Sequence, residues 1–301
     1  MKKNNYKYLR LLKTSFLFFI IYSCLFSKTE HNTIEVNRLT RDYYIYTPDT
    51  ININTALILI LHGYSGSALG IMNYSGFNKF VNDHNFIACY PQGTKDDKGY
   101  AFWNVGYAFH PDQTVDDVQF MVKLVSRLKN NYNISDHNIF VTGMSNGGEM
   151  SYMLGCHTQG VFKAIASITG VMFNSFLNNC NPNPINVFEV HGTKDNTNWW
   201  QGDADNKGGW GTYIGVEEGV NYWVDVNNCQ SFSSDTLFDS DESDGSYIIS
   251  DLHTNGINST QVLLYKVING GHDWPGSSGN MDINVSEEVL KFFHQFRLNI
   301  K

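Results

Sequence analysis

Three side chains in this sequence have the types and the order of a nucleophilic catalytic triad. Ser145 lies in a Gly-x-Ser-x-Gly pattern, Asp195 follows a short apolar run, and His272 lies in a glycine-flanked loop at residues 270–272. A serine hydroxyl is a weak nucleophile until a histidine removes its proton, and that histidine needs a carboxylate to fix its tautomer. The three residue types therefore predict acyl-transfer chemistry through Ser145.

The segment around Ser145 has the pattern of a buried strand that runs directly into a helix. Residues 139–142 are Ile-Phe-Val-Thr, and helix-forming residues follow Gly148. Gly143 and Gly147 suit a turn in which strand and helix nearly touch, because a side chain at either position would collide. We expect a strained turn that exposes the Ser145 hydroxyl at the positive end of the helix.

Two backbone N–H groups are predicted to form the oxyanion hole. They belong to Asn146, directly after the nucleophile, and to Tyr64, directly after His62-Gly63 at the end of a buried strand. His62 and His191 both precede a glycine at a strand end, so we expect them to support turns and not to act as bases. Asp195 could instead cap a local turn, with the alternative acids Asp203, Asp205 and Asp225 lying downstream.

Strands and helices alternate along the rest of the chain. Continuous apolar runs at 56–61, 86–90, 164–169 and 187–190 predict strands that are covered on both faces. Further strands are expected at 43–47, 138–143, 247–252 and 261–267, and helices at 77–84, 115–131, after Ser145, around 216–223 and at 286–297. The 115–131 helix should bury Val118, Val122, Val125 and Leu128, with Asp116 and Asp117 capping its start. Such alternation predicts an α/β fold with a mostly parallel sheet and helices on both faces.

Composition and the N-terminus indicate an exported chain. The 301 residues carry a net charge of −8, which argues against a nucleic-acid partner. Residues 1–27 combine a basic start with an apolar run and resemble a signal peptide, leaving 28–301 as one domain. Residues 21–24 also resemble a lipobox, which would make Cys24 a lipidated residue and the only link to a membrane. We therefore expect a secreted or periplasmic protein, anchored by lipid if Cys24 is acylated.

The other four cysteines allow three pairings in an oxidising compartment. Cys156 and Cys180 flank one strand segment and are the preferred pair, whereas Cys89 lies in a buried strand and suits a small core position. No Cys or His cluster has zinc spacing, so we expect no structural metal.

Several short motifs together resemble one enzyme family. They are His62-Gly63, Tyr90-Pro91-Gln92-Gly93-Thr94 with Trp103-Asn104, Val115-Asp116-Asp117-Val118, Gly143 to Gly148, His191-Gly192-Thr193-x-Asp195 and Gly271-His272-x-Trp274-Pro275-Gly276. In this order, over Tyr43 to Phe293, they are similar to the secreted poly(3-hydroxybutyrate) depolymerase-like esterases, which grade into feruloyl and acetyl-xylan esterases. The resemblance implies an α/β-hydrolase fold, the triad Ser145, Asp195 and His272, no cofactor, and carboxylic ester substrates. The Trp- and Gly-rich segment 196–212 departs from the family pattern.

Tryptophans in the predicted loops suggest how a polymer-derived ester substrate could be bound. This substrate would be a polyester or an esterified polysaccharide. Indole rings stack well on sugar rings or an aromatic acyl group, and the candidates are Trp103, Trp199, Trp200 and Trp274. Two other functions remain open from the sequence. The chain could be a serine peptidase on the same fold, or a non-catalytic carbohydrate-binding protein that uses these tryptophans. The oligomeric state is not indicated by any of these features.

Overall fold

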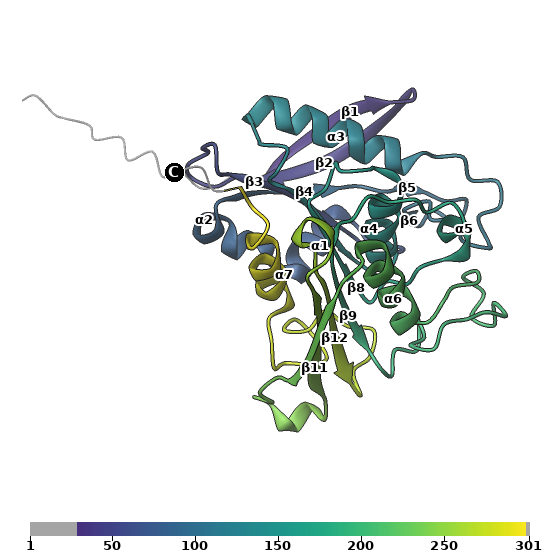
Figure 1. The fold of residues 1–301 in the computed structure, drawn as a ribbon. Coiled ribbons are helices and arrows are strands. Elements are labelled where there is room, and N and C mark those ends of the chain that lie inside the picture. The colour runs from purple at the N-terminus through teal and green to yellow at the C-terminus, as the bar shows by residue number, and fades with distance from the viewer. Residues whose placement is uncertain (1–28, 299–301) are drawn as a thin grey trace, which may run out of the picture.

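The computed structural model describes residues 29–298. The predicted signal peptide at 1–27, with Cys24, lies outside these residues. Within them, a ten-stranded sheet forms the centre of the molecule, and a second, two-stranded sheet lies beside it (Figure 1). The α/β class expected from the alternation of strands and helices is confirmed.

The large sheet is parallel in the middle and antiparallel at both edges. Its order is β1-β2-β4-β3-β7-β8-β9-β12-β11-β10, and the strands from β4 to β12 run parallel. The parallel strands are β3 (Ala56–Leu61), β4 (Phe86–Pro91), β7 (Ile139–Met144), β8 (Ala164–Ile168), β9 (Asn186–Gly192) and β12 (Val262–Ile268). The antiparallel strands are β1 (Glu30–Val36), β2 (Leu39–Tyr46), β10 (Ser231–Thr236) and β11 (Tyr247–Thr254). The small sheet pairs β5 (Thr94–Lys95) with β6 (Ala101–Phe102).

Helices cover both faces of the large sheet, so its side chains divide into two apolar cores. One core includes side chains of α3 (Asp117–Tyr132), α4 (Asn146–His157), α5 (Asn174–Leu177) and α6 (Val216–Asn227). The other includes α1 (Ala68–Ser75), α2 (Val81–His84) and α7 (Val285–His294). Because β3 and β4 are buried along their whole length, they need no polar alternation, which is why they read as continuous apolar runs.

Some sequence predictions of local structure were wrong. Val125 and Leu128 of α3 are buried as expected, but the buried face is rotated, because Val118 and Val122 are only half-buried and Phe120, Met121 and Leu124 are buried instead. Apolar residues occupy half of this helix, so periodicity alone leaves two possible faces. The edge strands β1 and β10 were not predicted. All six residues of β10 are exposed, so this strand lacks the alternation that marks a half-buried strand.

Asp116 and Asp117, both predicted to cap α3, have different roles. Asp116 accepts a hydrogen bond from the Gln119 N–H at 2.8 Å, as a cap should. Asp117 is buried and pairs with the Arg41 guanidinium at 2.7 Å, while its second oxygen accepts from the Asn104 N–H at 2.8 Å. Burial raises the pKa of Asp117, and the Arg41 charge opposes that shift. This ion pair ties β2 to the start of α3, which the sequence pattern did not indicate.

A disulfide joins Cys156, near the end of α4, to Cys180, in the loop after α5, as the sequence predicted. Cys89 is fully buried in β4, and burial raises the pKa of its thiol. Cys229 is half-buried and unpaired among the described residues. The disulfide therefore fixes the end of α4, the helix that directly follows Ser145.

Replacing both Cys156 and Cys180 by serine is expected to lower the free energy of unfolding by about 3 kcal/mol, because the disulfide closes a loop of 24 residues in the unfolded chain. Urea unfolding followed by tryptophan fluorescence measures the change. Cys229→Ser is the matched control and should shift the free energy of unfolding by less than about 1 kcal/mol. Equal stability of the double variant and the wild type would contradict the prediction.

Candidate active site

Ser145 lies at the turn between β7 and α4, as the sequence predicted. Its backbone adopts φ 54° and ψ −120°, a conformation that non-glycine residues rarely occupy. The Ser145 N–H donates to the Ile168 carbonyl of β8 at 2.8 Å, which anchors this strained residue to the neighbouring strand. The Ser145 hydroxyl does not cap α4, so it is available for another partner.

The two glycines of the turn are required by space. A Cβ at Gly147 would lie 2.3 Å from the Leu61 carbonyl oxygen, and a Cβ at Gly143 would lie 2.5 Å from the Gly147 carbonyl carbon. Real Cβ atoms do not approach other atoms this closely. The end of β3 and the first turn of α4 therefore touch through backbone atoms alone, and this contact defines the position of Ser145.

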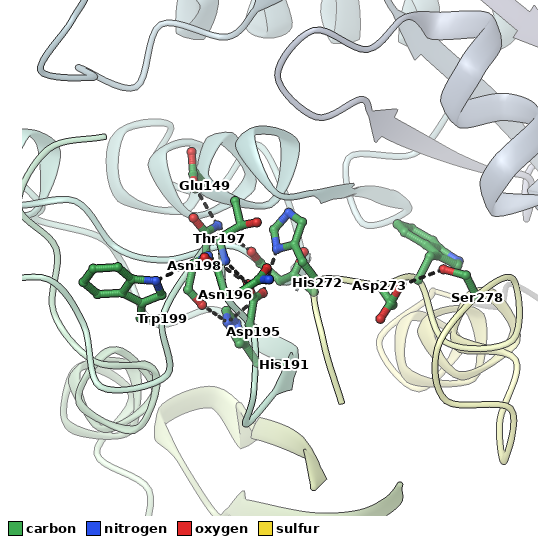
Figure 2. A network of polar contacts seen from close by, with 12 residues as sticks. Glu149, His191, Asp195, Asn196, Thr197, Asn198, Trp199, His272, Asp273 and Ser278 are labelled. Carbon is green, nitrogen blue, oxygen red and sulfur yellow. Dashed lines mark hydrogen bonds and ion pairs between the residues drawn. The ribbon is translucent and has the colours of Figure 1, made fainter. Parts of the chain in front are cut away.

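Asp195 and His272 are brought together at the carboxyl edge of the sheet. The His272 Nδ1 lies 2.6 Å from Asp195 Oδ2 (Figure 2). The other carboxylate oxygen, Oδ1, accepts from the N–H groups of Thr197 at 2.8 Å and Asn198 at 2.9 Å. Asp195 therefore caps a local turn and holds the imidazole at the same time. A Cβ at Gly192 would lie 2.3 Å from the Gly271 carbonyl oxygen, so the end of β9 and the His272 loop also pack through backbone atoms.

His191 lies beneath this pair and supports the turn, as expected. Its Nε2 lies 2.8 Å from the Asn198 carbonyl oxygen and 3.4 Å from Asp195 Oδ2, and its Nδ1 lies 2.8 Å from Glu189 Oε1. A carbonyl oxygen only accepts, so Nε2 carries a proton and donates. Burial opposes the charge on His191, but the Glu189 carboxylate outweighs it and raises the pKa of the imidazole. His191 and Glu189 thus form a buried pair that fixes the loop carrying Asp195.

Of the two predicted oxyanion donors, Asn146 lies at this turn and Tyr64 lies in the loop after β3. Asn146 is the first residue of α4, so its N–H points out of the helix end. Gly63, before Tyr64, approaches the nucleophile, because a Cβ built there would lie 3.5 Å from the Ser145 Cβ. The His62 ring supports this loop: its Nδ1 donates to the Gly63 carbonyl at 2.8 Å, and its Nε2 accepts from the Gly93 N–H at 3.0 Å. Burial lowers the pKa of His62 to about 4, so the ring stays neutral and serves the turn.

The prediction that four tryptophans bind substrate is wrong for two of them. Trp274 is fully buried, and its indole N–H donates to Ser286 Oγ at 3.0 Å. Trp103 is also fully buried, and its indole N–H donates to the His62 carbonyl at 2.9 Å. A large ring in a core position has no face left for a substrate. Trp199 and Trp200 are half-buried in the loop after β9, so their role as binding residues stays a prediction.

The segment 196–212 packs against aromatic residues of the Tyr64 loop and of residues 107–109. The Trp210 ring packs edge-on against the rings of Tyr64, Tyr107 and Phe109, with centroids 5.2 to 5.6 Å apart. The Ala108 N–H donates to the Trp210 carbonyl at 2.9 Å. The tryptophan of this segment that contacts Tyr64 is thus Trp210, which the sequence analysis did not select.

Two further findings concern ligands and membranes. Among residues 29–298, no group of three or more His, Cys, Asp or Glu side chains is placed to hold a metal ion. In the same part of the chain, no helix has the length and the apolar character that a membrane crossing requires.

Sequence comparisons find similarity to several esterases and to one peptidase family. Residues 74–204 match the model of the prolyl oligopeptidase family. The chain is 26% identical over 155 residues to a bifunctional acetylxylan esterase/xylanase of Neocallimastix patriciarum, covering 52% of this chain and 21% of that protein. It is 33% identical over 131 residues to a poly(3-hydroxybutyrate) depolymerase of Ralstonia pickettii (41% and 27%), and 26% identical over 176 residues to feruloyl esterase D of Neurospora crassa (54% and 56%). The chain thus spans less than two thirds of each of these relatives.

Solved structures agree on the fold. An acetyl xylan esterase from Aspergillus awamori superposes with a TM-score of 0.63 at 16% identity, covering 89% of this chain and 99% of that one. A putative dipeptidyl aminopeptidase IV from Bacteroides ovatus superposes with a TM-score of 0.60 at 14% identity, covering 90% and 36%. The topology and these superpositions therefore define the α/β-hydrolase fold class, in which a Ser, Asp, His order along the chain is typical. Within that class, the resemblance to acetylxylan esterases, feruloyl esterases and poly(3-hydroxybutyrate) depolymerases is confirmed.

Replacing Trp274 by alanine is expected to lower the free energy of unfolding by about 3 to 5 kcal/mol, because the change empties a fully buried site. Trp199→Ala removes a half-buried ring from a loop and should change the same quantity by less than about 1 kcal/mol. Urea unfolding of both variants measures the two effects. Equal losses would show that Trp274 does not serve the core in the way its burial indicates.

Proposed function

We propose that this protein is a serine hydrolase that cleaves carboxylic esters through an acyl-enzyme. The observation that carries the proposal is the pair formed by His272 and Asp195 at the sheet edge where Ser145 occupies its strained turn. The named relatives supply independent support, because an acetylxylan esterase, a poly(3-hydroxybutyrate) depolymerase and a feruloyl esterase all act on ester bonds.

The proposed reaction begins with the activation of the Ser145 hydroxyl by His272 and Asp195. Asp195 accepts a hydrogen bond from the His272 Nδ1–H group, which fixes the tautomer with Nε2 unprotonated and able to take the proton of the Ser145 hydroxyl. The Ser145 oxygen attacks the ester carbonyl, and the backbone N–H groups of Asn146 and Tyr64 stabilise the resulting oxyanion. His272 returns the proton to the leaving alcohol, and a water molecule then releases the acid by the same sequence of steps.

We propose an esterified polysaccharide as the substrate class, with a polyester as the alternative. Two cavities of about 480 and 490 Å³ share Arg41, Thr94 and Lys95, and the second extends to Ser65, the residue after Tyr64. Tyr100 lines the second cavity and is 48% exposed. Hydroxyl, amide and charged groups with an exposed phenol ring suit a sugar chain better than an apolar polyester.

Ser145→Ala is expected to reduce hydrolysis of p-nitrophenyl acetate by at least about 10⁴-fold, because the nucleophile is removed. Thermal unfolding of the variant should show a folded protein, since the hydroxyl does not cap α4. A fluorophosphonate should label the wild type and not the variant. Labelling of both proteins, or of neither, would refute the proposal, and absent labelling would favour a non-catalytic carbohydrate-binding protein.

A serine peptidase is the second candidate, because the family model that matches residues 74–204 is that of prolyl oligopeptidases. We expect turnover of acetylated xylan or methyl ferulate to exceed that of poly(3-hydroxybutyrate) and of proline-containing peptide anilides. Product release from equal amounts of each substrate measures the order. Faster cleavage of the peptide would reverse the choice of reaction, and faster cleavage of the polyester would reverse the choice of substrate.

We propose that the chain is exported, on the basis of its basic and apolar first 27 residues. The Cys156–Cys180 disulfide supports an oxidising compartment. Mass spectrometry of the mature N-terminus is expected to find either an acylated Cys24 or a start near Ser27. Recovery of the intact leader on a reduced protein in the cytoplasm would contradict export.

A further inference from the structure

We propose that Glu149 is a positioning residue of the active site, whose carboxylate fixes the oxyanion-hole residue Asn146 relative to the loop that carries Asp195. This inference rests on the proposed ester hydrolysis and assigns a role that the triad itself does not require. Glu149 lies four residues after Ser145, in the first turn of α4, and is 1% exposed.

Glu149 connects to both halves of the site. Its backbone N–H donates to the Ser145 carbonyl at 2.8 Å. Its Oε1 accepts from Asn198 Nδ2 at 3.0 Å, and its Oε2 accepts from the Tyr107 hydroxyl at 2.6 Å and from Asn146 Nδ2 at 3.4 Å. In Figure 2, the Asn198 side chain leads from Glu149 toward the loop that carries Asp195.

Asn198 links Glu149 to Asp195, the carboxylate of the proposed triad. The Asn198 N–H donates to Asp195 Oδ1 at 2.9 Å, and its carbonyl oxygen accepts from His191 Nε2 at 2.8 Å. Its side-chain amide also donates to the Thr169 carbonyl at 2.6 Å, so the amide plane is fixed from two directions. A shift of Asn198 would therefore move the carboxylate that orients His272.

The Asn146 branch controls the oxyanion hole. Asn146 Oδ1 accepts from the Trp103 N–H at 2.7 Å, and Nδ2 donates to the Trp103 carbonyl at 3.1 Å as well as to Glu149. Trp103 in turn donates its indole N–H to the His62 carbonyl, next to the Gly63-Tyr64 donor. The same carboxylate is thus linked to both predicted oxyanion donors.

The ionised carboxylate at this position opposes folding, which argues against a role in stability alone. Burial raises the pKa of Glu149 from 4.5 to about 7, the donors Tyr107, Asn198 and Asn146 lower it, and the charge of Asp195 raises it further. Because the folded state binds this proton more tightly than the unfolded state, the contribution of Glu149 to stability falls as the pH rises from about 4.5 to 7. All three side-chain partners are donors, so only an ionised carboxylate accepts from all of them.

The test compares Glu149→Gln with a matched control, Glu288→Gln. Glu288 on α7 also accepts from a tyrosine, Tyr265, at 3.1 Å, but it lies outside the site. In Glu149→Gln, one carboxylate oxygen becomes an NH₂ group that faces a hydrogen-bond donor. The hydrogen bond from Asn198, or those from Tyr107 and Asn146, is therefore lost. We expect kcat for p-nitrophenyl acetate to fall roughly 10- to 100-fold with KM within about twofold, because misplaced catalytic groups lose rate and not ground-state binding. The rate of inactivation by a fluorophosphonate should fall by a similar factor.

Thermal unfolding at pH 8 should show Glu149→Gln to be at least as stable as the wild type, since the variant carries no buried charge. An unchanged kcat, or a kcat loss matched by equal loss in Glu288→Gln, would overturn the inference. If Glu149→Gln does not fold, Asn198→Ala provides the same test, and an unchanged kcat in that variant would also overturn it. A wild-type protein without esterase activity would instead refute the proposed function.

Discussion

The contact between the end of β3 and the first turn of α4 is the constraint on which the site depends. Gly147 packs directly on the Leu61 carbonyl, and Gly143 packs on Gly147. With no Cβ between them, the strand and the helix meet at backbone distance, and the residue between the two glycines must turn through a strained conformation. Ser145 occupies that position at φ 54°, while its N–H is bound to β8. The strain is sustained because strands on both sides determine the turn.

A buried polar network extends from this turn across the carboxyl edge of the sheet. Two carboxylates, Glu149 and Glu189, are fully buried in this network, and burial raises the pKa of both. Each is satisfied by hydrogen bonds from neighbouring elements, as buried polar groups require. Such a network is sensitive to the loss of any member, because an unpaired buried charge is far more unfavourable than an exposed one. The loop after β9 is therefore held by His191 and Asn198 and not by apolar packing alone.

The geometry separates a fixed centre around Ser145, Asp195 and His272 from the loops around it. The loops that carry Asp195 and His272 are held by backbone contacts at glycines and by buried hydrogen bonds. The exposed ring of Tyr100 and the half-buried ring of Trp199 lie on loops around this centre. Loops on a fixed scaffold are where binding specificity usually varies. The same fold occurs in an acetyl xylan esterase and in a putative dipeptidyl aminopeptidase, so the fold alone does not specify the substrate.

The sequence by itself determined the central strands, the turn at Ser145 and the order of Ser145, Asp195 and His272, and it favoured Cys156–Cys180 among three possible pairings. The strands and the turn are local features: a buried strand is a continuous apolar run, and a turn without space for a Cβ needs glycine. The tertiary structure decided the rest. Trp274 and Trp103 resemble surface binding residues in the sequence because they lie in loops, yet the loops fold inward and bury both rings. Glu149 has no pattern that marks it, because its partners Tyr107 and Asn198 are 42 and 49 residues away in the chain. The exposure of β10 and the rotated face of α3 depend on which neighbouring element each packs against. Local sequence patterns do not specify these packing partners.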